Sequence, residues 1–110
     1  MSARNLSTLL GMIIVLSLAL AACGGSEGAS TAPTGDPAAG QQAFASLTCT
    51  GCHGENAEGR IGPKLAGLQE GWEKVQTTVR NGRGGMPQFG TDEVNDKQLT
   101  DIYAWLTSLK

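Results

Sequence analysis

The sequence has few of the residues that several common classes of protein need. Its 110 residues include a single histidine, His53, and three cysteines. A structural zinc site takes about four nitrogen or sulfur ligands, so His53 and its two neighbouring cysteines do not complete one. Lysine and arginine number 8 against 10 acidic residues. They form no basic stripe, so we do not expect nucleic acid as a partner.

Large apolar side chains and regular β-patterns are also scarce. The chain has two tryptophans, one tyrosine and two phenylalanines against 16 glycines. No stretch alternates between apolar and polar residues for long enough to predict a strand. The length allows one domain, whose core would be marginal without a further stabilising group. The composition therefore predicts a small all-α domain with long loops.

One short motif indicates what that stabilising group is. Cys49-Thr50-Gly51-Cys52-His53 reads C-x-x-C-H, the attachment signature of a covalent c-type haem. Two thiols three positions apart can each add to a vinyl group of one porphyrin, and the next imidazole is then held under the iron as an axial ligand. A thioredoxin-like dithiol would belong to a βαβ unit, which this sequence does not indicate. A plain disulfide leaves the His-Gly sequence after Cys52 unexplained.

The N-terminus predicts export. Residues 1–7 carry one positive charge, on Arg4, and the following segment, Leu9–Leu20, is almost wholly apolar. Twelve residues rising about 1.5 Å each do not cross a hydrocarbon core of about 30 Å. The segment is therefore more typical of a secretory signal peptide than of a transmembrane helix.

The apolar segment ends in Leu20-Ala21-Ala22-Cys23, which resembles a bacterial lipobox. The resemblance implies that residues 1–22 are a removed signal peptide and that Cys23 carries lipid. The alternative is an uncleaved anchor helix with an incidental Cys23. Both interpretations place the domain outside the cytoplasm, anchored to the outer side of the cytoplasmic membrane or to the outer membrane. Residues 23–35 are rich in Gly, Ser and Thr and predict a flexible linker, which leaves residues 36–110 as the folded domain.

The first of three predicted helices covers residues 37–47. Asp36 offers an N-cap acceptor, and Pro37 suits the first helical position. Gly40 lies inside this helix at a cost of about 1 kcal/mol relative to alanine. We interpret it as the place where another helix crosses closely, with a tolerated accident as the alternative.

Two further helices follow a loop over residues 54–67. The second covers residues 70–81, and its apolar face consists of Trp72, Val75 and Val79. The third begins at the N-cap Asn95, with Gln98 as its capping-box partner. Its apolar stripe, with Trp105 at the edge, consists of Leu99, Ile102, Tyr103, Leu106 and Leu109.

A low-spin haem needs a second axial ligand, usually histidine or methionine. The chain has no second histidine. Met1 and Met12 lie in the predicted signal peptide, so Met86 is the one methionine left. It lies in a glycine-rich loop over residues 82–90, long enough to cover the far face of a porphyrin. The alternative is an ordinary core side chain, which is the usual role of methionine.

These residues together resemble class I cytochrome c, the small bacterial monohaem cytochromes with histidine and methionine as iron ligands. The resemblance covers most of residues 36–110. It rests on Gly40 and Phe44, Cys49-Thr50-Gly51-Cys52-His53, Gly62-Pro63-Lys64-Leu65, Met86-Pro87-Gln88-Phe89 and Asp101–Leu106. In one departure, Phe44 precedes Cys49 by five residues where four is common, so the turn into the haem motif should differ.

The resemblance implies one haem c, attached through Cys49 and Cys52, with His53 and Met86 as axial ligands. The fold would be that of a small cytochrome c, three to four helices around the haem. Pro63 and Leu65 would line the haem pocket, with the Pro63 carbonyl accepting a hydrogen bond from the proximal imidazole.

Two further expectations concern side-chain packing. Trp105 or Leu106 should pack at Gly40 and Phe44, by analogy with the helix pair of the family. Trp72 is a candidate for the haem pocket and, with Arg60 and Arg83, a candidate donor to the haem propionates. Core packing for the tryptophan and surface solvation for the arginines are the alternatives.

The implied function is single-electron transfer between membrane-associated redox complexes, without enzymatic turnover. Two filled axial positions keep dioxygen and peroxide away from the iron, and the haem supplies the redox chemistry. The family implies a quinol–cytochrome c oxidoreductase as donor and a terminal oxidase or photosynthetic reaction centre as acceptor, and we expect a monomer. A haem enzyme or gas sensor with an open sixth position, and a lipoprotein without haem, are the alternatives.

Overall fold

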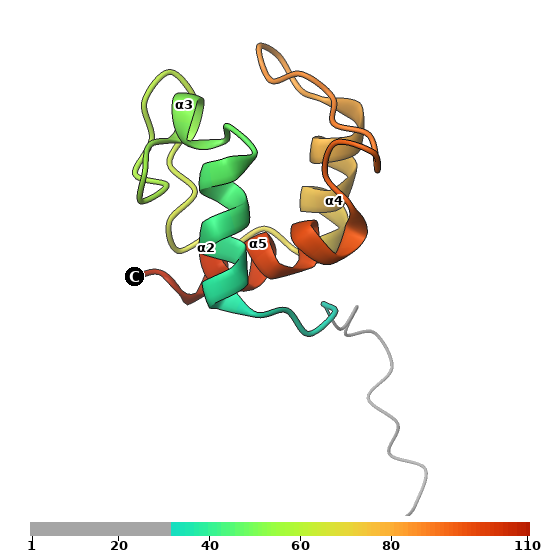
Figure 1. Ribbon diagram of the computed structural model, residues 1–110. Helices are drawn as coiled ribbons and strands as arrows, with labels where there is room; N and C mark the ends of the chain where they lie inside the picture. Colours follow the sequence, from blue (N-terminus) through green and yellow to red (C-terminus); the bar gives the residue numbers. More distant parts are fainter. Residues whose placement is uncertain (1–31) are drawn as a thin grey trace, which may run out of the picture.

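The computed structural model describes residues 32–110. The predicted signal peptide, Cys23 and the linker up to residue 31 lie outside the described residues, so the domain boundaries stay predictions. The described part contains four helices, α2 (Pro37–Ser46), α3 (Thr50–His53), α4 (Trp72–Asn81) and α5 (Asp96–Ser108), and no strand (Figure 1). The predicted all-α class is therefore correct. None of these helices is long and apolar enough to span a membrane.

The beginning of α2 follows from its first residues. The Asp36 carboxylate accepts hydrogen bonds from the backbone N–H groups of Ala38 and Ala39, at 2.9 and 3.3 Å, which confirms the predicted N-cap. The helix ends at Ser46, and Thr48 has a φ of +66°. A β-branched residue rarely adopts this left-handed conformation. At this strained turn the chain leaves α2 and enters α3, which carries the haem motif.

The beginnings of α4 and α5 differ in how well the sequence predicts them. Asn95 accepts a hydrogen bond from the Gln98 N–H at 2.8 Å, and the Gln98 side chain accepts one from the Asn95 N–H at 3.0 Å. This is the predicted capping box. In contrast, α4 begins at Trp72, two residues later than predicted, because extended backbone at Gly71 precedes it.

Helices α2 and α5 form the main helix–helix contact, and Gly40 determines how closely they approach. A Cβ atom at Gly40 would overlap the backbone carbonyl of Asp101, and it would lie 2.8 Å from the Ile102 nitrogen. Any side chain larger than hydrogen would push the two helices apart. The predicted close crossing at Gly40 is confirmed, although the partner there is backbone and not the side chain of Trp105 or Leu106.

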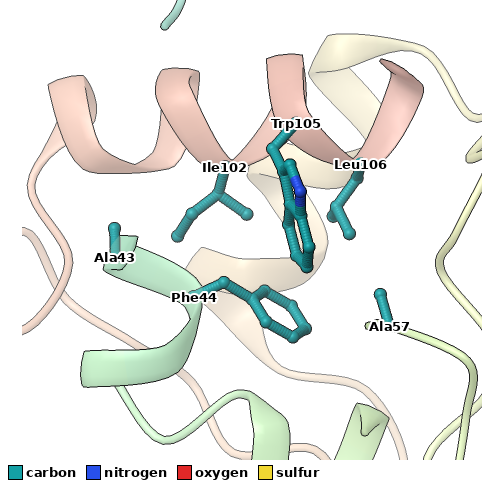
Figure 2. Packing of buried hydrophobic residues seen from close by; sticks show 6 residues of the cluster. All are labelled: Ala43, Phe44, Ala57, Ile102, Trp105 and Leu106. Atoms are coloured by element: carbon teal, nitrogen blue, oxygen red, sulfur yellow. The ribbon is translucent and has the colours of Figure 1, made fainter. Parts of the chain in front are cut away.

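The apolar core lies at this crossing. It consists of Ala43, Phe44, Ala57, Ile102, Trp105 and Leu106 (Figure 2). The Phe44 and Trp105 rings lie 5.0 Å apart at 55°, a favourable tilted arrangement, so the predicted packing of Trp105 on Phe44 is correct. Its predicted place at the edge of the stripe is wrong, since Trp105 is buried. Asp101 and Trp105 lie one turn apart on the same side of α5. The close approach of α2 at Gly40 buries this side of the helix.

Asp101 ties the start of α2 to α5. Its carboxylate is buried and accepts hydrogen bonds from Lys97 Nζ at 2.6 Å and from the Asp36 N–H at 2.9 Å. These two donors, the lysine first, lower the pKa of Asp101 below its ordinary value of 3.8. The folded state therefore favours the charged carboxylate.

This pKa predicts a pH dependence of stability. Because the folded pKa is depressed, the contribution of Asp101 is present above about pH 4, the ordinary range of a carboxyl group, and is lost as pH falls through the folded pKa. Asp101→Asn should lower the thermal midpoint by several degrees at neutral pH and should flatten its decrease below pH 4. Thermal denaturation of the haem-loaded protein between pH 3 and 7 measures both. Equal midpoints for wild type and variant at neutral pH would contradict this.

Candidate haem-binding site

A cavity of about 920 Å³ lies between two parts of the domain. Helices α2 and α3 stand on one side, α4 and the loop after it stand on the other, and α5 runs below both (Figure 1). The cavity lining includes residues from all four helices and from both long loops. Its volume is at the upper end of the range for sites that enclose a small molecule or cofactor.

The C-x-x-C-H motif forms α3 and one wall of the cavity. Cys49, Cys52 and His53 all line it, and both thiols are free. Burial raises the pKa of the Cys49 thiol above its ordinary value of 9.0, so this thiol is protonated at neutral pH. The two thiols and the imidazole predicted to act together are therefore brought to one surface.

The His53 ring is held in a defined orientation. It is 8% exposed, and its Nδ1 atom lies 2.8 Å from the Pro63 carbonyl oxygen. A carbonyl oxygen only accepts, so Nδ1 carries the proton and donates it. The lone pair is then on Nε2, the atom left free to ligate a metal. The hydrogen bond that the resemblance predicts to Pro63 is present.

Gly62 explains how the Pro63 carbonyl comes so close to the ring. Its N–H donates to the Cys52 carbonyl at 2.8 Å, so the loop folds back onto the motif. A Cβ atom at Gly62 would lie 2.9 Å from His53 Cε1 and 3.0 Å from Nδ1. The glycine of the Gly62-Pro63 pair thus makes room for the imidazole. We did not predict this role from the sequence, because only the fold brings the loop back to the ring.

Met86 lies in the loop on the other side of the cavity, the methionine loop (residues 82–95). It follows a tight turn in which the Met86 N–H donates to the Arg83 carbonyl at 2.9 Å and the Arg83 N–H donates to the Met86 carbonyl at 3.1 Å. Gly84 within this turn has a φ of +56°, which suits glycine. Met86 is half-buried and lines the same cavity as His53.

The apolar face of α4 supports a large apolar occupant for this cavity. No residue of α4 is buried by the rest of the chain, although the helix is amphipathic. Val75 and Val79 instead line the cavity, together with Leu65, which also packs against the core. Filling the cavity with a planar apolar group would remove these side chains from water. The residues present therefore fit a porphyrin.

Trp72 and the predicted propionate donors are placed differently. The Trp72 ring lies edge-on to Tyr103 at 5.5 Å and is not among the residues that line the cavity, so its predicted place in the haem pocket receives no support. Arg83 lines the cavity and Arg60 does not. The cavity lining contains two further cations that we did not propose as propionate donors, Lys64 and Lys74. Nothing in their sequence context distinguishes them from other surface lysines.

The fold and the site define a small α-helical protein built around a C-x-x-C-H motif, and comparison with known proteins identifies the family. Residues 35–106 match the family described as "Cytochrome C oxidase, cbb3-type, subunit III". The chain is also 33% identical to cytochrome c-551 of Bacillus subtilis (strain 168), over 86% of this chain and 88% of that protein. The chain therefore belongs to the cytochrome c family.

Two other relatives match shorter parts of the chain. Cytochrome c-550 of Bacillus subtilis (strain 168) is 34% identical over 56% of this chain and 51% of its own length. The menaquinol:cytochrome c reductase cytochrome c subunit of Geobacillus thermodenitrificans is 45% identical over 42% of this chain and 20% of its own length. No solved structure is significantly similar to the chain.

Membership of this family has two direct consequences. The cofactor is a covalently bound haem c, and Cys49 and Cys52 fit the motif that binds it. The activity is electron transfer by a carrier protein and not enzymatic turnover.

Proposed function

We propose that this cytochrome c is a membrane-anchored single-electron carrier whose haem iron is ligated by His53 and Met86. One observation carries the proposal. Cys49, Cys52 and His53 on one side, and Met86 on the other, line the same apolar cavity. An imidazole from α3 and a thioether from the methionine loop are the ligand pair that raises the potential of a cytochrome c.

Each of these residues has a separate task. The two cysteines hold the porphyrin, and His53 presents Nε2 because its Nδ1 proton is donated to Pro63. Met86 fills the second axial position and keeps external ligands away from the iron. The haem supplies reversible one-electron chemistry. Lys64, Lys74 and Arg83 provide positive charge for the haem propionates, since all three line the cavity.

We further propose a quinol–cytochrome c oxidoreductase as electron donor and a terminal oxidase as acceptor. The donor is supported by the likeness to a relative named as a menaquinol:cytochrome c reductase subunit. The acceptor is supported by the family description, which names a cytochrome c oxidase. No comparison supports the photosynthetic reaction centre, the other acceptor that the resemblance implies.

Electron transfer from a quinol-oxidising complex tests this proposal. The purified ferric holoprotein is mixed with menaquinol and membranes that contain a menaquinol–cytochrome c reductase, and haem reduction is followed optically. We expect rapid reduction that an inhibitor of the reductase abolishes. Reduction at the same rate without the membranes, or none with them, would contradict the proposed donor.

We also propose that Cys23 carries the lipid that anchors the protein to the membrane. If Cys23 is acylated, Cys23→Ser should abolish labelling by radioactive palmitate and leave the precursor unprocessed or cleaved elsewhere. Ser26→Ala, three residues further along, is the matched control and should be labelled like the wild type. Gel mobility and label incorporation in cells measure both effects. Undiminished labelling of Cys23→Ser would exclude Cys23 as the acylated residue.

A further inference from the structure

We propose that Arg80 is a positioning residue for Met86, because its guanidinium holds the methionine loop closed against α4 and thereby slows the dissociation of Met86 from the iron. The inference rests on the proposed axial role of Met86. It goes beyond that role because it names the side chain that sets how often the distal site opens.

The contacts of Arg80 connect three segments. Arg80 lies in the last turn of α4, and its side chain is 19% exposed. Its Nη1 donates to the carbonyl of Phe89 at 3.1 Å and to that of Val94 at 2.6 Å. Its Nη2 donates to Asp96 Oδ1 at 2.6 Å. One planar side chain thus bonds the middle of the methionine loop, its end and the first turn of α5.

Phe89 is the point at which this arrangement acts on Met86. The Phe89 N–H donates to the Val79 carbonyl at 2.8 Å, and its own carbonyl accepts from Arg80. Both backbone polar groups of Phe89 are therefore bonded to the end of α4. On the other side, Met86 is held by its paired hydrogen bonds with Arg83. Met86 lies between these two fixed points, with only Pro87 and Gln88 between it and Phe89.

The shape of arginine is needed for these bonds. The planar guanidinium can reach three acceptors in one orientation, whereas a lysine ammonium acts as a single point charge. Val94 is buried. If a shorter, uncharged side chain replaced Arg80 and the loop stayed closed, the Val94 carbonyl would have no hydrogen-bond donor. Hydrogen bonds from a charged donor are strong. Losing one of these hydrogen bonds should therefore shift the equilibrium between the closed and the open methionine loop toward the open state by about ten-fold or more.

Cyanide binding to the ferric holoprotein measures this opening. At saturating cyanide the binding rate is limited by how often Met86 leaves the iron. The test variants are Arg80→Gln, which removes the charge, and Arg80→Lys, which keeps it. The control is Lys97→Gln, which removes one exposed cation from α5 and its bond to Asp101 but none of the three bonds of Arg80.

The expected rates follow from the bonds that each variant retains. Arg80→Gln should bind cyanide about ten-fold faster or more, Arg80→Lys should be intermediate, and Lys97→Gln should stay close to wild type even if its thermal midpoint falls. A wild-type rate in Arg80→Gln, or an equal acceleration in Lys97→Gln, would overturn the proposal. If Arg80→Gln yields no holoprotein, a wild-type rate of cyanide binding in Arg80→Lys would overturn the proposal instead.

The same measurement separates this proposal from the one on which it rests. If Met86 is not the ligand, wild type itself binds cyanide as fast as Met86→Ala, and the far-red charge-transfer band that methionine gives ferric haem is absent. If Met86 is the ligand but Arg80 does not position it, the band is present and the Arg80 variants behave like wild type.

Discussion

Met86→Ala should open the haem iron to external ligands. In the ferric protein cyanide should bind readily, in the ferrous protein carbon monoxide should bind, and peroxidase activity should appear. The wild type should do none of these at neutral pH, because the thioether occupies the site. Met86→His should stay six-coordinate and low-spin, yet its midpoint potential should fall on the order of 0.2 V, a fraction of the range of about 0.8 V that axial ligands span.

Gln88→Ala is the matched control for these variants. Gln88 lies in the same loop, is exposed and does not line the cavity, so its loss should change neither potential nor ligand binding. An unchanged ferric spectrum and potential in Met86→Ala would show that Met86 is not the ligand. Lys64 and Lys74, which both line the cavity, would then be the next candidates, and the proposed ligation by His53 and Met86 would be wrong.

The double variant Cys49→Ser, Cys52→Ser should bind no haem covalently, and its domain should be largely unfolded. The physical reason lies in α4. None of its residues is buried by the rest of the chain, and two of its valines line a cavity of about 920 Å³. Without the porphyrin, α4 keeps only limited apolar contacts, such as that of Trp72 with Tyr103, and these do not offset the entropy of ordering that half of the domain.

Haem staining of a denaturing gel and thermal denaturation followed by circular dichroism measure the two effects. Gly51→Ala is the control inside the motif, since a Cβ atom there would meet no other atom within 4 Å. It keeps the spacing of the two thiols and should carry haem like the wild type. A cooperative thermal transition in the haem-free double variant would contradict the proposed dependence of the fold on haem.

The features that the sequence predicted correctly depend on neighbouring residues. The Asp36 cap and the capping box of Asn95 and Gln98 are formed within one helical turn, so local chemistry determines them. The C-x-x-C-H motif is equally local. Gly40 is the exception, because a glycine inside a helix indicates a close neighbour even when the neighbour is unknown.

The features that sequence reasoning missed depend on residues far apart in the chain. The burial of Trp105 and Asp101 depends on the crossing of α2 and α5, which a single helical stripe does not reveal. Trp72 packs on Tyr103 at the start of α4, although its spacing from Val75 and Val79 suggested that all three share one role. The hydrogen-bond partners of Arg80 lie 9 to 16 residues away from it in the sequence. No local sequence pattern indicates that an arginine makes such contacts.

The most direct test of the central claim is the far-red absorption spectrum of the ferric wild-type holoprotein at neutral pH. If His53 and Met86 ligate the iron, a weak charge-transfer band from the thioether should be present. The band should persist in Gln88→Ala and vanish in Met86→Ala. A wild-type spectrum without the band, in a protein that carries covalent haem, would contradict the account.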